Sequence, residues 1–243
     1  MKEIRYFYVP NAATVGELPE EEAKHAVKVL RLQSGDRMVL VDGEGGLFDA
    51  EVSVASGKHC LYNILETLPY EREWRGRISI AIAPTKMMDR IEWMAEKATE
   101  IGFDEISFLD CKFSERKTLR TDRVERIVVS AMKQSLKAKL PLVEEPVSVR
   151  DFILGHSGDS GVKMICYCFE GETLRRSIKD VLEGLPSDSA VTVLIGPEGD
   201  FSPEEARLAV GHGFVPVHLG PSRLRTETAA VTAVTACYLH FME

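Results

Sequence analysis

The feature that most constrains the fold is a regular alternation of two sequence patterns beyond residue 76. Short apolar runs typical of strands are separated by longer segments with the apolar spacing of helices. We expect strands at 78–83, 105–109, 162–168, 190–195 and 215–218, and helices near 87–101, 121–138, 148–155, 173–183, 203–212 and 227–241. This alternation predicts an α/β domain whose parallel sheet is covered by helices on both faces.

One helix start in this region is marked by its residues. Ser202 can cap the helix, Pro203 suits its first position, and Glu205 stands three residues after the cap. Together they form the pattern of a capping box, so we expect a helix to begin at residue 203.

Residues 1 to about 70 have a different pattern and predict a small β-barrel. Strand-like runs occur at 5–9, 37–41, 47–54 and 60–65, and residues 20–32 have helical spacing. The glycines of Asp42-Gly43-Glu44-Gly45-Gly46 suit a hairpin connection. A polar stretch at 69–76 contains Pro and Gly, and we therefore expect two domains, residues 1–72 and 73–243.

Composition indicates a folded protein of the cytoplasm. Apolar residues make up 44% of the 243 positions, the N-terminus is charged, and no segment has the ~18 apolar residues of a spanning helix. The five cysteines are scattered, which predicts reduced thiols and no zinc site. Cys166 and Cys168 alternate within a strand-like run, so we interpret them as buried thiols in preference to metal ligands.

The charge distribution gives weak support for an RNA partner. The net charge is −8, but residues 112–139 contain nine basic and three acidic residues. A polyanion binds through Lys and Arg, whereas a solvated helix face would have the same composition. The charge pattern alone leaves both interpretations open.

Three loops follow strands of the predicted sheet and are candidates for a ligand site. They are residues 170–173, 196–201 and 220–230. Ligands of open α/β sheets bind at the carboxyl ends of the strands, and glycines allow a close approach to the backbone. None of the loops has a GxxxxGK[ST] or GxGxxG pattern, so a nucleoside without a polyphosphate fits better than NAD or ATP.

The same loops resemble those of the SPOUT methyltransferases. The motifs are Ile195-Gly196-Pro197-Glu198-Gly199, then Leu219-Gly220 and Leu224-Arg225-Thr226-Glu227-Thr228-Ala229. Within that superfamily the chain resembles the 16S ribosomal RNA uracil-N3 methyltransferases over nearly its whole length. The further matches are His25 with Val29-Leu30-Arg31, Gly35-Asp36, Asp42-Gly43, residues 96–102, Ser114-Glu115-Arg116, Gln134-Ser135 and Pro141.

The resemblance implies a fold, a reaction and partners. It implies a PUA-like β-barrel before a trefoil-knotted α/β domain that forms a homodimer. It implies transfer of a methyl group from S-adenosylmethionine to N3 of a uridine in 16S rRNA of the 30S subunit, the family target being uridine 1498. No metal and no membrane are expected.

The resemblance also implies roles for individual residues. We expect the cofactor to be bound by Phe169, Glu170, Gly171, Ile195, Gly196, Pro197, Glu198, Gly199, Leu219, Gly220, Leu224, Thr226, Thr228 and Ala229. We expect Arg225 to stabilise negative charge on the uracil or Glu198 to accept its proton, with Arg225 preferred. We expect RNA contacts from Arg31, Arg116, Arg126, Lys133 and Lys137.

Three positions depart from the family pattern, and two other functions remain open. Asp200 stands where the family usually has glycine, and Lys133 and Lys137 stand where it commonly has Glu and Arg. Lysine lacks the bidentate fork of arginine, so the RNA contact of Lys137 is an open question. The alternatives are a SPOUT enzyme with another rRNA or tRNA target, and a non-enzymatic RNA-binding or ribosome assembly protein.

Overall fold

A computed structural model describes residues 5–169 and 174–242 and divides the chain into two compact units. The first unit comprises residues 1–72 and 129–140, and the second comprises 73–128 and 141–243. The division falls within the helix α4 (Thr121–Gln134), whose last turns are counted with the first unit. Each unit is described separately.

The first unit contains a four-stranded sheet in the order β1-β2-β3-β4. Its strands are β1 (Tyr6–Tyr8), β2 (Arg37–Val41), β3 (Leu47–Ser56) and β4 (His59–Leu68). β1 pairs with β2 in parallel, and the other two pairings are antiparallel. The four predicted strands are confirmed, and β4 continues three residues beyond its predicted end at 65.

The predicted hairpin between β2 and β3 is confirmed. Gly43 and Gly45 have φ angles of +86° and +101°, a conformation that glycine adopts without strain. The Asp42 carboxylate accepts hydrogen bonds from the backbone amides of Glu44 and Gly46, both at 2.8 Å. These bonds fix the turn because they satisfy amides that no strand partner reaches.

The helix predicted at 20–32 is divided. It consists of α2 (Glu20–Lys24) and a π-helical turn, η1 (His25–Val29). A further short helix, α1 (Ala12–Val15), lies before it in the sequence. Arg31 then adopts a left-handed conformation with φ +56°, and the Leu32 amide donates to the Ala26 carbonyl at 3.0 Å. This bond ends the helix and brings Leu32 into the core of the unit, which the sequence pattern could not indicate.

The last part of α4 and the segment after it complete the first unit. Met132 and Ala138 are buried against Val39, Val41 and Leu47. The helix predicted at 121–138 ends at Gln134, because Leu136 takes a left-handed conformation with φ +60°. The chain then turns back, and the Leu140 amide donates to the Gly43 carbonyl at 2.8 Å.

The second unit is built on an eight-stranded, fully parallel sheet, which confirms the predicted α/β class. Its strands are β5 (Arg77–Ile82), β6 (Glu105–Asp110), β7 (Leu142–Val143), β8 (Val147–Ser148), β9 (Val162–Cys166), β10 (Arg176–Ser177), β11 (Ala190–Ile195) and β12 (Val215–His218). Their order is β10-β12-β9-β11-β5-β6-β7, and β8 also pairs with β6. β9 therefore lies between β11 and β12.

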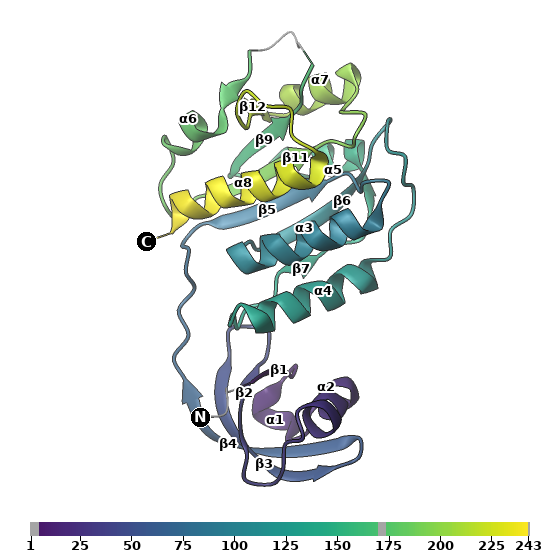
Figure 1. Cartoon of the computed structure of the whole chain (residues 1–243). Coiled ribbons are helices and arrows are strands. Elements are labelled where there is room, and N and C mark those ends of the chain that lie inside the picture. The colour runs from purple at the N-terminus through teal and green to yellow at the C-terminus, as the bar shows by residue number, and fades with distance from the viewer. Residues whose placement is uncertain (1–4, 170–173, 243) are drawn as a thin grey trace. The chain divides into compact units, whose positions relative to one another are not determined.

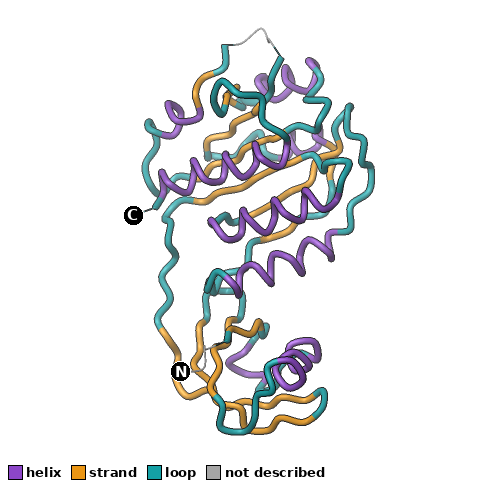
Figure 2. The backbone as a smooth tube through the Cα atoms, in the orientation of Figure 1, coloured by secondary structure: helices purple, strands orange, loops and turns teal. Residues whose placement is uncertain are grey.

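Helices cover both faces of this sheet (Figures 1 and 2). α3 (Met88–Ile101) and α8 (Thr226–Phe241) pack together on one face, where α6 (Ile178–Leu182) also contacts α8. α5 (Val149–Gly155) and α7 (Pro203–Gly211) pack together on the other face. Ala81, Ile165 and Leu194 belong to the core under α5 and α7. The helix predicted at 173–183 begins only at Ile178, and residues 170–173 lie outside the described part of the chain.

The capping box at the start of α7 is confirmed. The Ser202 hydroxyl accepts from the Glu205 amide at 3.3 Å, and the Ser202 amide donates to the Glu205 carboxylate at 2.7 Å. In the described part of the chain, no helix is both long and apolar enough to cross a membrane. The trefoil knot stays a prediction.

The first unit contains a nearly buried ion pair that joins α2 to α4. Lys133 pairs with Glu22, whose side chain is 13% exposed. Lys133→Ala would leave a buried carboxylate without its cation, and we expect a loss of about 2 to 3 kcal/mol in the free energy of unfolding, measured by urea denaturation. The free energy of unfolding of the double variant Glu22→Gln/Lys133→Met should fall by less than that of Lys133→Ala, because no buried charge is left unpaired. The exposed Lys28→Ala serves as the control, and equal effects of all three would contradict the role of the pair.

Candidate functional site

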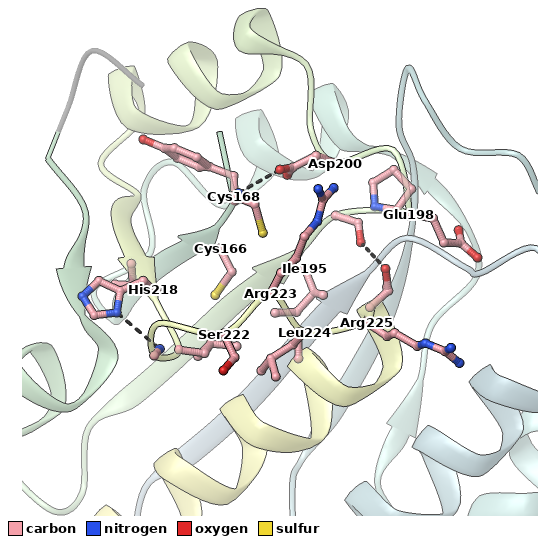
Figure 3. A pocket seen from close by; sticks show the side chains of 18 of the residues that line it. Cys166, Cys168, Ile195, Glu198, Asp200, His218, Ser222, Arg223, Leu224 and Arg225 are labelled. Carbon is pink, nitrogen blue, oxygen red and sulfur yellow. Dashed lines mark hydrogen bonds between the residues drawn. The ribbon is translucent and has the colours of Figure 1, made fainter. Parts of the chain in front are cut away.

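The loops that follow β9, β11 and β12 meet around a cavity of about 790 Å³. They are neighbours because β9 lies between β11 and β12 and all three strands are parallel. Figure 3 shows their side chains converging on this cavity. The lining residues are Arg90, Cys166, Tyr167, Cys168, Arg175, Ile195, Gly196, Pro197, Glu198, Asp200, Val217, His218, Leu219, Gly220, Pro221, Ser222, Arg223, Leu224, Arg225, Thr226 and Ala229.

Hydrogen bonds between the loops fix the shape of the cavity. The buried Thr226 hydroxyl donates to the Gly196 carbonyl at 3.1 Å, joining the start of α8 to the loop after β11 (Figure 3). The Gly220 amide lies 3.3 Å from Nδ1 of His218. Gly220 has a φ angle of +123°, which glycine adopts readily at this turn. These contacts fix the positions of the loops relative to one another.

Asp200 joins the first two loops. Its carboxylate accepts from the Cys168 amide at 2.8 Å (Figure 3). It also accepts from the Phe201 amide at 2.8 Å. Asp200 has a φ angle of +67°, a left-handed conformation that costs a non-glycine residue about 1 kcal/mol. The two charge-assisted bonds offset this strain. They also explain how an aspartate is accommodated at a position where the family resemblance predicts glycine, since its carboxylate binds two backbone amides.

The glycines of the loop after β11 have a packing role. A Cβ atom on Gly196 would lie 3.0 Å from the ring of Phe201, and one on Gly199 would lie 2.9 Å from Cβ of Phe113. The sequence predicted that these glycines let a ligand approach the backbone. The geometry shows that they make room for two phenylalanines of the protein itself.

The cavity brings together nine of the fourteen residues expected to bind a cofactor. These are Ile195, Gly196, Pro197, Glu198, Leu219, Gly220, Leu224, Thr226 and Ala229. Phe169 and Gly199 line a second cavity of about 410 Å³ beside the first. Thr228 lines neither, and its carbonyl accepts from the Thr232 hydroxyl at 2.8 Å. Glu170 and Gly171 lie outside the described residues.

The two residues expected to act on the substrate differ in their surroundings. Glu198 Oε1 accepts from the Lys86 amide at 2.9 Å, so this carboxylate holds the loop that follows β5. Arg225 is exposed, and among the described residues its guanidinium has no hydrogen bond or ion pair. Arg225 is thus available to a ligand, whereas Glu198 is already engaged by the backbone.

Several charged residues of the cavity were not predicted from the sequence. Arg90 comes from α3, and its Nε lies 3.8 Å from a carboxylate oxygen of the buried Glu227. Arg175 donates to the Tyr167 carbonyl at 2.6 Å. Arg223 extends across the cavity (Figure 3). Arg90 could not be assigned from the sequence, because the central position of β5, which brings the start of α3 to this edge of the sheet, is shown only by the structure.

The two cysteines of the cavity are not equivalent. β9 ends at Cys166, so the strand predicted to 168 is too long, and Cys168 is exposed in the loop. The buried-thiol interpretation is therefore wrong for Cys168. Burial raises the pKa of the Cys166 thiol, and it raises the pKa of the nearby Cys237 to about 12, so both stay protonated at neutral pH. Among the described residues, no three His, Cys, Asp or Glu side chains are grouped as metal ligands.

The residues expected to contact RNA are found in different settings. In the first unit Arg31 is exposed, Lys133 pairs with Glu22, and Lys137 is only 5% exposed. In the second unit Arg116 donates to the carbonyls of Thr85 and Lys86, and the exposed Arg126 pairs with Asp122. Lys133 and Lys137 therefore contribute to the interior of the first unit.

Comparison with known proteins agrees with this architecture. The profile of the RNA methyltransferase domain matches residues 72–238, and that of the RNA methyltransferase PUA domain matches residues 18–65. The chain belongs to the RNA methyltransferase family. This methyltransferase is 30% identical to ribosomal RNA small subunit methyltransferase E of Synechocystis sp., over 85% of this chain and 67% of the relative.

Solved structures extend the likeness over both units. A probable rRNA-methyltransferase from Porphyromonas gingivalis is 42% identical, with a TM-score of 0.89 and 98% of each chain covered. Ribosomal RNA small subunit methyltransferase E from Neisseria gonorrhoeae, bound to S-adenosyl methionine, is 26% identical, with a TM-score of 0.82 and 96% of each chain covered. The predicted family resemblance is confirmed.

The strained conformation of Asp200 leads to a test of the loop geometry. Asp200→Ala removes both backbone bonds and keeps a side chain at a positive φ, so we expect the free energy of unfolding to fall by about 2 kcal/mol. Asp200→Gly also removes the bonds but relieves the backbone strain, so its free energy of unfolding should fall by less than that of Asp200→Ala. Urea denaturation of both variants measures the difference. A loss for Asp200→Gly as large as that for Asp200→Ala would contradict the strain.

Proposed function

We propose that this methyltransferase transfers a methyl group from S-adenosylmethionine to N3 of a uridine in 16S rRNA, the family target being uridine 1498. The observation that carries the proposal is the cavity between the three loops, with the exposed guanidinium of Arg225, unpaired in the described part of the chain, at its edge. The names of the relatives, small subunit methyltransferase E, support the choice of ribosomal RNA.

The described residues fit an adenosyl cofactor. The cavity of about 790 Å³ is within the range of small-molecule sites, and the walls of Gly196, Leu219, Gly220 and Leu224 offer backbone groups and apolar side chains. None of the three loops has the sequence pattern of a phosphate-binding loop. The cofactor, when bound, supplies a methyl group on a positively charged sulfur. The lining carries charges of both signs, Glu198 and Asp200 beside Arg90, Arg175, Arg223 and Arg225.

Methylation at N3 requires that the uracil lose a proton, and this sets the task of the protein. The proton is held roughly two to three pK units above neutral pH, a handicap of about 3 to 4 kcal/mol. Arg225 can stabilise negative charge on the uracil oxygens because its guanidinium is permanently charged and unpaired among the described residues. We assign charge stabilisation to Arg225.

Glu198 is assigned a structural role. Its bond to the Lys86 amide joins the loop after β11 to the loop after β5, and this contact occupies one carboxylate oxygen. The second oxygen remains a candidate proton acceptor, a role that ranks behind the structural one. The rest of the acceleration comes from the alignment of the reacting atoms by the rigid loops.

RNA recognition is proposed to use exposed cations of each unit. Arg31 in the first unit and Arg116 and Arg126 in the second retain N–H groups at or near the surface. Lys133 and Lys137 support the fold instead, because one is paired and the other is buried. A homodimer remains a prediction from the resemblance, and a cytoplasmic location remains a prediction from composition.

The function is tested with labelled S-adenosylmethionine and 30S subunits from a strain that lacks the modification. We expect label in 16S rRNA at a single uridine, located by mapping of the modified nucleotide. Label in tRNA or in 23S rRNA would favour a different target. A protein that binds subunits without any transfer would be an assembly factor.

Arg225→Ala tests the mechanism. Loss of a group that stabilises developing charge should lower kcat by about 100-fold to 1000-fold while S-adenosylmethionine binding, measured by calorimetry, stays unchanged. Arg225→Lys keeps the charge without the bidentate fork of arginine, so its kcat should lie between that of Arg225→Ala and that of the unaltered protein. The exposed Arg150→Ala on α5 is the matched control. Normal turnover in Arg225→Ala would exclude the assigned role.

A further inference from the structure

A second cavity of about 410 Å³ adjoins the first. It shares Cys168, Asp200 and Arg223 with the larger cavity and is otherwise lined mainly by Phe113, Phe169 and Phe201. Neither Arg225 nor Glu198 reaches it. The second cavity is therefore next to the proposed reaction site but does not contain the groups assigned to the reaction.

Phe113 is the most unusual residue of this cavity, because it is a large apolar residue that is 44% exposed. Its loop is nonetheless firmly held: the Lys112 amide donates to Glu205 at 2.7 Å, and the Cys111 amide donates to Ser114 at 3.0 Å. The absence of a side chain at Gly199 lets the Phe113 Cβ lie against the neighbouring loop. A rigid backbone thus presents an aromatic face to solvent at the cavity.

The cavity also has the charge that a nucleotide requires. Nζ of Lys112 lies 5.5 Å from the centre of the Phe113 ring and is already paired with Glu204 at 3.3 Å, so the available charge comes from Arg223. Arg223 is exposed, and among the described residues its guanidinium has no hydrogen bond or ion pair. Both carboxylate oxygens of Asp200 accept hydrogen bonds from backbone N–H groups, so they attract the guanidinium of Arg223 less strongly. An aromatic face beside an arginine without a partner among the described residues is an arrangement with which proteins bind unpaired bases and their phosphates.

We propose that the second cavity binds an unpaired nucleobase that neighbours the methylated uridine, stacked on Phe113, with Arg223 contacting the adjoining phosphate. The proposal rests on the proposed function in that the substrate is RNA. Since Arg225 lines only the larger cavity, the reacting base is placed there and the smaller cavity receives the next base of the strand. Such a contact would hold a flipped target in place.

The test separates binding of RNA from binding of the cofactor. Phe113→Ala should raise KM for unmodified 30S subunits on the order of tenfold, because one stacked base is lost, and should leave the affinity for S-adenosylmethionine unchanged. Phe113→Trp keeps an aromatic face and should stay within about twofold of the unaltered protein. Arg223→Ala should also raise KM for subunits, and this effect should diminish as salt increases.

Leu154→Ala is the matched control, because Leu154 is 38% exposed on α5 and lines neither cavity. An unchanged KM for Phe113→Ala, or no recovery in Phe113→Trp, would overturn the proposal. Weaker cofactor binding with an unchanged KM for subunits would assign the cavity to the cofactor and overturn it as well. If the unaltered protein transfers no methyl group to 16S rRNA, the proposed function fails first, which is a distinguishable result.

Discussion

The order of three parallel strands determines the rest of the site. Because β9 lies between β11 and β12, three loops that are far apart in the sequence end at one edge of the sheet. The Thr226 hydroxyl then bonds the Gly196 carbonyl, and Asp200 bonds the Cys168 amide. Each bond joins two of the three loops. Without that strand order, neither bond could form and the cavity would have no walls.

Much of the fold could be predicted from periodicity, because burial imposes it on the sequence. The strands at residues 78–82 and 190–195 have buried apolar runs, and the start of α7 has its capping box. The ends of elements were less predictable. Arg31 and Leu136 adopt left-handed conformations that only their tertiary surroundings stabilise, so helices predicted to 32 and 138 end earlier.

The site could be predicted in part, for a related reason. Loop motifs such as Gly196 to Gly199 are local, and the cavity includes most of them. Arg90 was missed because it is contributed by α3, which packs against α8 through the tertiary fold. For Lys133 the sequence predicted a surface position that the tertiary fold does not give it. Its charge indicated a surface, but Glu22 from a distant segment pairs with it in the interior of the first unit.

The arginines of the cavity explain how one site can suit both a cation and a polyanion. Arg90 lies near the buried Glu227, and Arg175 donates to a backbone carbonyl, so these two are largely compensated by the protein. Arg223 and Arg225 have no such partners among the described residues. Of these four arginines, the uncompensated pair should attract RNA most strongly, because a charge with an internal partner gains less from a new one. In a chain of net charge −8, binding of RNA therefore depends on where its cations are left unpaired more than on how many it has.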